Sequence, residues 1–231
     1  MRMFFQTAAI ASLAASLLAP APIQHSTHNG QKARRHFFSI SYDWQYTHPL
    51  GFDKHPLEDL LGQPVDEVHL QNFQYRTADG LTTVSVQEFD HHGQGIGLTI
   101  YPFGSSEGTT LAIRGSIEQL PDLHMTFAGA APLSSYTLTN GRAYDVAVGL
   151  DMSDRSPGWG VGSHAFILAG LGRAHSDQAD GSRYFAEGGG GVMSGPIGVD
   201  ISVKVATNRF STPVSHSFLT IPISVRGTFS F

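Results

Sequence analysis

The chain has no cysteine and few charged residues. The absence of cysteine among 231 residues excludes disulfide bonds, thiolate metal sites, cysteine nucleophiles and an acylated-cysteine lipoprotein anchor. Charged residues make up 14%, where soluble domains average about 25%. The net charge of −5 provides no attraction for nucleic acid, which we do not expect as a partner. Something other than charged side chains must therefore cover much of the surface.

Long hydrophobic runs are also missing beyond the N-terminus. Residues 1–22 combine Arg2, an apolar run from Phe4 to Leu18 and a small-residue end at Ala21, a pattern typical of a secretory signal peptide. The run is short of the ~20 residues that a spanning helix needs, although an N-terminal membrane anchor remains the alternative. Residues 23–35 are polar and aperiodic and predict a flexible periplasmic leader. No later segment has ~18 consecutive apolar residues, so we expect no helical span there.

The features that are present indicate β-structure. The chain has 26 glycines and 10% aromatic residues, a composition that favours strands joined by tight turns. From residue 36 onward apolar and polar residues alternate with period two, which places one set on each face of a strand. Tyr42 and Trp44, for example, share one face, while Ser41 and Asp43 share the other. We therefore predict a single all-β domain over residues 36–231.

The alternating segments predict about ten strands, with eight or twelve also compatible. We place them at 36–46, 67–77, 81–90, 94–103, 109–119, 141–152, 159–173, 182–194, 197–210 and 216–231. Residues 120–140 are either a long loop or a further hairpin. In a ten-strand meander the short connections all fall at one end, at 78–80, 104–108, 153–158 and 195–198. The long connections fall at the other end. This asymmetry is typical of a closed, antiparallel, up-and-down transmembrane barrel, with short periplasmic turns and long external loops.

Charged residues at mid-strand distinguish a membrane barrel from a soluble β-sandwich. In a membrane barrel the apolar set faces lipid and the polar set faces the lumen, so charges are tolerated where they point inward. Several charged residues and one histidine lie on the polar parity of their strands at similar distances from the predicted periplasmic end: Asp43, Arg114, Asp145, His164, Glu187, Lys204 and Arg226. We predict that they form one near-neutral lumen layer that plugs the barrel. Solvated charges on an open sheet face are the alternative.

Aromatic residues lie near the predicted strand ends, where interfacial belts would need them. They are Phe37, Phe38, Tyr101, Phe103, Trp159, Phe229 and Phe231 at the periplasmic end and Trp44 and Tyr46 at the other. Aromatic packing in a soluble core is the alternative explanation.

The C-terminal strand resembles the segment that closes bacterial outer-membrane barrels. A terminal phenylalanine follows alternating apolar residues, in the series Ile221, Ile223, Val225, Phe229 and Phe231. Gly227 interrupts the series and Pro222 removes one donor of the hydrogen-bond ladder. The chain is thus similar to small outer-membrane barrels of the opacity-protein type. This resemblance implies a location in the bacterial outer membrane, contact with its lipid, and recognition by the barrel assembly machinery during biogenesis.

No chemistry stands out from the sequence. The chain has twelve histidines, and apart from the adjacent pair His91 and His92 their spacing matches no metal-ligand motif. Those that fall in or beside the predicted external connections are His48, His55, His91, His92, His124, His175 and His216, with His69 close by. His164 and Glu187 are the conceivable catalytic pair, at mid-depth in the lumen. Gly188–Gly191 lacks the lysine and helix of a phosphate loop. We therefore expect a non-enzymatic surface protein without metal or cofactor, whose external loops contact an unknown partner. A narrow channel for small solutes and a lipid-modifying enzyme are the alternatives.

Overall fold

The computed structural model describes the chain from His36 onward, with gaps. The described residues are 36–52, 58, 61–69, 74–89, 92–105, 108–129, 135–154, 161–210 and 216–231. The predicted signal peptide (1–22) and leader (23–35) lie outside them. The described residues contain no helix with the length and hydropathy needed to cross a membrane.

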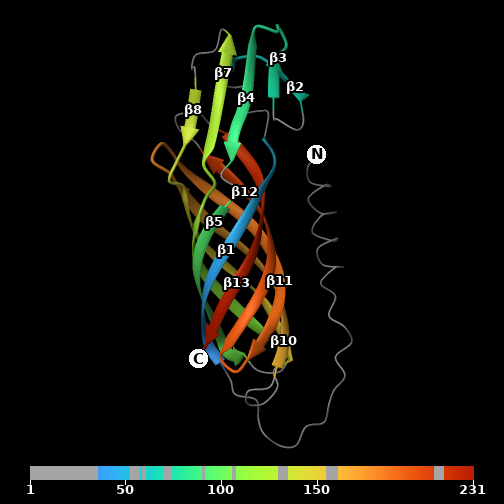
Figure 1. Cartoon of the computed structure of the whole chain (residues 1–231), viewed down its shortest axis with the longest axis vertical. Helices are drawn as coiled ribbons and strands as arrows, with labels where there is room; N and C mark the ends of the chain where they lie inside the picture. The colour runs from blue at the N-terminus through green and yellow to red at the C-terminus, as the bar shows by residue number, and fades with distance from the viewer. Residues whose placement is uncertain are drawn as a thin grey trace, which may run out of the picture.

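Eight long strands close into an antiparallel barrel with up-and-down topology (Figure 1). They are β1 (His36–Phe52), β5 (His92–Ser105), β6 (Gly108–Gln119), β9 (Arg142–Asp154), β10 (Val161–His175), β11 (Asp180–Ser194), β12 (Ile197–Phe210) and β13 (His216–Ser230). β1 closes the barrel because it pairs with β13 along one edge and with β5 along the other. The stacked-sheet alternative is therefore wrong, and the predicted count of about ten barrel strands is corrected to eight.

The remaining strands form a second sheet beyond one end of the barrel (Figure 1). We call this five-stranded sheet the cap; it consists of β2 (Val65–His69), β3 (Gln74–Thr77), β4 (Thr82–Phe89), β7 (Leu123–Gly129) and β8 (Ser135–Leu138), in the order β2-β3-β4-β7-β8. The segments predicted as strands at 67–77 and 81–90 fall here, so the turn at 78–80 does not join barrel strands. The open question at 120–140 resolves as the hairpin β7-β8.

Strand length distinguishes the barrel from the cap. The barrel strands have 12 to 17 residues, whereas those of the cap have 4 to 8. The cap strands are inserted into two of the connections at the same end, between β1 and β5 and between β6 and β9. These two insertions pair with each other through β4 and β7.

The barrel is apolar outside and polar inside. Along β1 the alternation places Tyr42 and Trp44 on the exterior, each 51% exposed, and buries Ser41 and Asp43. The same parity continues on other strands, with Val148 and Ile201 outside and Asp145 and Lys204 inside. Each side chain thus follows the pleat of its strand, as the period-two pattern predicts.

Buried apolar residues form two clusters. One joins the cap to the barrel mouth and includes Leu123 and Met125 of the cap together with Phe210 and Phe218 of the barrel, which stack with ring centroids 5.9 Å apart. The other lies inside the barrel and includes Tyr101, Phe166, Leu168 and Phe185. The cap is therefore anchored by its own hydrophobic core.

Candidate functional site

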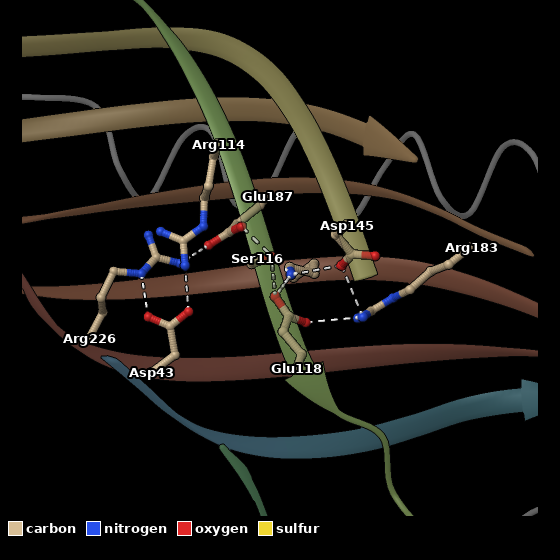
Figure 2. Close-up of polar contacts among 9 residues, drawn as sticks. Asp43, Arg114, Ser116, Glu118, Asp145, Arg183, Glu187 and Arg226 are labelled. Carbon is tan, nitrogen blue, oxygen red and sulfur yellow. Dashed lines mark hydrogen bonds and ion pairs between the residues drawn. The ribbon is translucent and has the colours of Figure 1, made fainter. Parts of the chain in front are cut away.

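Charged side chains from six barrel strands meet inside the lumen (Figure 2). We call this cluster the lumen network; its carboxylates are Asp43, Glu118, Asp145 and Glu187, and its cations are Arg114, Arg183, Lys204 and Arg226. Each is at most 3% exposed. Desolvated charges persist only when they are paired and hydrogen-bonded, so the geometry of the pairs decides whether the cluster is viable.

One half of the network is centred on Asp43. Its Oδ2 accepts a hydrogen bond from Arg114 Nη2 at 2.5 Å, and its Oδ1 accepts one from Arg226 Nε at 2.6 Å. Arg226 also donates through Nη2 to Glu187. Because Arg226 stands opposite Asp43 in the β1-β13 register, neighbouring strands supply this pair directly. The fork of the guanidinium thus joins carboxylates from two strands.

The other half is centred on Glu118 and Asp145. Arg183 Nη1 donates to Glu118 Oε2 at 3.0 Å and to Asp145 Oδ2 at 3.1 Å. Lys204 Nζ bonds to Glu118 and lies 3.6 Å from Asp145 Oδ2. The same ammonium lies 3.8 Å from Glu187 Oε2, which links this half to the first.

The network is electrically balanced, because it contains four carboxylates and four cations. Aromatic rings add to the pairing: Lys204 Nζ lies 4.5 Å from the ring centroid of Phe185, and the Arg226 guanidinium lies 5.2 Å from that of Phe166. Contacts of this kind stabilise a cation whose hydration has been removed. The arrangement fills the middle of the barrel with fixed side chains.

A second polar cluster lies in the same lumen, around His164. Its Nε2 is 2.7 Å from Asp200 Oδ1, and its Nδ1 is 3.4 Å from Asp151 Oδ2. Tyr101 donates its hydroxyl to Asp151 Oδ2 at 3.1 Å. A cavity of about 30 Å³ borders these residues and also Arg226, and it has room for water. This cluster orients the histidine between two carboxylates.

The structure places all seven predicted lumen residues inside the barrel but not in one layer. Asp43, Arg114, Asp145, Glu187, Lys204 and Arg226 belong to the lumen network, whereas His164 belongs to the separate cluster with Asp151 and Asp200. Four more inward charges lie outside the predicted layer: Glu118, Asp151, Arg183 and Asp200. All four lie on the polar parity of predicted strands. The alternation along each strand is therefore the sequence signal that places these four side chains in the lumen.

The side-chain positions correct one expectation and remove one alternative. Tyr101 was expected in an interfacial belt, but it is buried in the lumen because its odd position on β5 shares the inward parity of Thr99. His164 and Glu187 do not form a catalytic pair, because Glu187 bonds to Arg226 while His164 bonds to Asp200.

The glycine run on β11 makes room for neighbouring side chains. A Cβ on Gly189 would lie 2.5 Å from Cζ of Phe166, and one on Gly191 would lie 2.4 Å from Oδ1 of Asp200. These glycines therefore allow bulky lumen residues on the adjacent strands to approach the wall. They do not form a phosphate loop, since β11 is a continuous strand.

The C-terminal residues lie on the exterior and take part in barrel closure. Ile223, Val225, Phe229 and Phe231 are 45 to 55% exposed, and Ile221 is half-buried. Phe231 N donates to Phe38 O at 2.9 Å, and the two rings stack with centroids 5.9 Å apart. The last residue of the chain thus pairs with the first strand of the barrel.

The histidines that the structure describes near the cap end are dispersed. His92 packs against Trp44 and Tyr46, His124 bonds Thr137, and His175 bonds Asp180 at 2.5 Å. Within the described ranges, no group of three or more histidine or acidic side chains has the geometry of a metal site. His55 and His91 lie outside these ranges.

Comparison with known proteins identifies no relative: no protein-family model matches the chain, and no curated sequence is significantly similar to it. The geometry of the barrel is therefore the basis for any functional assignment.

Proposed function

We propose that this chain is a non-enzymatic integral outer-membrane protein, exported by its N-terminal signal, whose cap is the contact surface for partners outside the cell. The observation that carries the proposal is the inverted barrel, with aliphatic and aromatic side chains on the exterior and paired charges sealed inside. A soluble eight-stranded barrel fills its interior with side chains that avoid water. An apolar exterior on this scale instead favours a hydrocarbon environment.

The topology supports an orientation with the cap outside. In transmembrane barrels the short turns face the periplasm and the long connections face outward. Here β1 begins at His36 and β13 ends just before Phe231, and both of these strand ends lie opposite the cap (Figure 1). The exposed Phe229 and Phe231 also suit recognition by the barrel assembly machinery.

The filled lumen weighs against the channel alternative. The lumen network occupies the barrel interior, and the hydrophobic core beneath the cap covers its mouth. The enzymatic alternative lacks support from His164, whose described partners are Asp151 and Asp200.

The test exploits a substitution whose effect depends on the solvent. Val148 is at mid-strand on β9, outward-facing and 52% exposed, and Leu81 of the cap is 65% exposed. In water Val148→Lys would be nearly neutral, whereas at a bilayer midplane a lysine costs about 2–4 kcal/mol. We expect Val148→Lys to reduce refolding into phosphatidylcholine vesicles, measured as heat-modifiable gel mobility, while Leu81→Lys refolds like the parent. Equal refolding of both variants, or a parent that stays folded in buffer without lipid or detergent, would overturn the proposal.

A further inference from the structure

A groove opens on the barrel exterior where the β5-β6 ladder ends. The register between these strands runs from Ile100 opposite Ile113 to Gly95 opposite Glu118. Beyond that point β5 remains paired with β1 as far as His92, and β6 remains paired with β9 as far as Gln119. The end of pairing leaves a groove of about 360 Å³ in the wall near the cap.

The groove is amphipathic. Its apolar wall is formed by Tyr42, Ile96 and Ile117, each of which faces outward. Its rim toward the cap is formed by Gln94, Gln119 and Arg142. Apolar surface on the membrane side and polar groups on the aqueous side match the polarity of a lipid, whose headgroup lies above its acyl chains.

The guanidinium at the rim is not neutralised by a described residue. Every cation of the lumen network touches a carboxylate, whereas exposed Arg142 has no ion-pair partner among the residues that the structure describes. Arg173 on the next strand is also exposed and lies two residues before His175, which is opposite Arg142. The carboxylate of Asp180 nearby bonds to His175. The carboxylates of Asp122 and Asp177 are bonded to Asn140, which also lines the groove. Among the described residues that line the groove, Arg142 is the one cation.

We propose that this groove binds one anionic lipid through a phosphate of its headgroup. Its phosphate would lie against Arg142 with Arg173 adjacent, because a guanidinium fork matches two phosphate oxygens. The amides of Gln94 and Gln119 donate to the headgroup, and an acyl chain follows Tyr42, Ile96 and Ile117. The inference rests on the proposed membrane location and adds a headgroup-selective site to it.

Trp44 provides a reporter at the groove. It faces outward opposite Gln94 in the β1-β5 register, and the chain has only one other tryptophan, Trp159. The full-length mature chain with Trp159→Phe is reconstituted into phosphatidylcholine vesicles that contain brominated phosphatidylglycerol or brominated phosphatidylcholine at equal mole fraction. We expect phosphatidylglycerol to quench Trp44 with a relative binding constant about fivefold higher, the effect of one arginine near an anionic headgroup.

The matched control is an arginine on the other side of the barrel. Arg209 is exposed near the cap end of β12, and the strand order places β12 across the barrel from β5 and β6. Arg142→Gln should lower the preference for phosphatidylglycerol to about that of bulk lipid, whereas Arg209→Gln should retain it. Equal quenching by both lipids in the parent, or equal loss in both variants, would overturn the groove site while leaving insertion intact. Absence of quenching by either lipid would instead contradict the membrane location itself.

Discussion

Lys204 lies close to more carboxylates than any other cation of the lumen network. Its ammonium contacts Glu118, lies within 4 Å of Asp145 and Glu187, and stands over the ring of Phe185. Replacing one member of such a cluster costs more than the pair contributes, because the partners stay buried without compensation. The stability of the barrel should therefore be sensitive to this residue.

We predict that Lys204→Ala lowers the free energy of unfolding by about 3–5 kcal/mol, measured by urea unfolding from detergent micelles. Arg209→Ala, an exposed cation on the same strand, should change it by less than about 1 kcal/mol. Adding Glu118→Gln to Lys204→Ala should recover part of the loss, since it neutralises an orphaned carboxylate. Equal effects of Lys204→Ala and Arg209→Ala would show that the lumen charges are solvated.

The alternation of polar and apolar residues shows which side chains of the network face inward, but not their height along the barrel axis. Period-two parity places Glu118 and Arg183 on the inward faces of their strands as clearly as Asp43. Neither belongs to the predicted layer, because equal distance along each strand from its short-turn end defines that layer. Strands of a barrel tilt by roughly 40° and are staggered by its shear, so equal counts along the chain do not give equal heights. The same stagger separates His164 from the network.

Tyr136 of the cap provides a prediction for alkaline pH. Burial raises the pKa of its hydroxyl from 10.0 to about 12, because the phenolate would lose hydration. A raised pKa means that the native state favours the protonated form, so its contribution to stability is complete below pH 10 and is lost as the pH rises toward 12. The absorbance of phenolate, compared between the parent and Tyr136→Phe, should show one tyrosine titrating near pH 12. A difference that titrates at the ordinary value would show that the cap does not bury this ring.

At the level of elements, strand length separates the two sheets better than alternation does. The segments at 67–77 and 81–90, the first with irregular alternation, are predicted as strands, and both contain strand residues. They belong to the cap, so the prediction that they are barrel strands is wrong. Leu70, Phe73 and Tyr75 do not share a parity, and residues 70–73 lie outside the described residues, between β2 and β3. Pairing of β4 with β7 across 33 intervening residues, from Phe89 to Leu123, has no local signal in the chain.

The cap should behave as an element with its own core. Leu123 is fully buried where the cap meets the barrel mouth, whereas Leu81, in the turn just before β4, is largely exposed. We predict that Leu123→Ala destabilises the cap by about 2–5 kcal/mol, detected as faster amide hydrogen exchange in β4 and β7, with protection of the barrel strands retained. Leu81→Ala should leave exchange in both sheets unchanged. Loss of protection throughout the barrel in Leu123→Ala would mean that cap and barrel unfold together.

At the scale of the whole molecule, two obstacles lie in series along the barrel axis. The hydrophobic core between cap and mouth covers one end, and the lumen network fills the interior behind it. Each alone would block hydrated ions, the first by excluding water and the second by occupying the cross-section with fixed side chains. The barrel wall itself has the strand number at which side chains fill the interior.

This arrangement predicts which obstacle seals the barrel. In planar bilayers the parent should show conductance at background, and so should a protein in which short turns replace residues 53–91 and 120–141, because the lumen network stays in place. Conductance should appear only when Glu118, Asp145, Arg183 and Lys204 are also changed to serine, which removes two carboxylates and two cations and leaves room for water. Heat-modifiable gel mobility verifies that each protein is folded. Ion flow through the cap-truncated protein with an intact network would show that the cap is the seal and that the paired charges leave a continuous aqueous path.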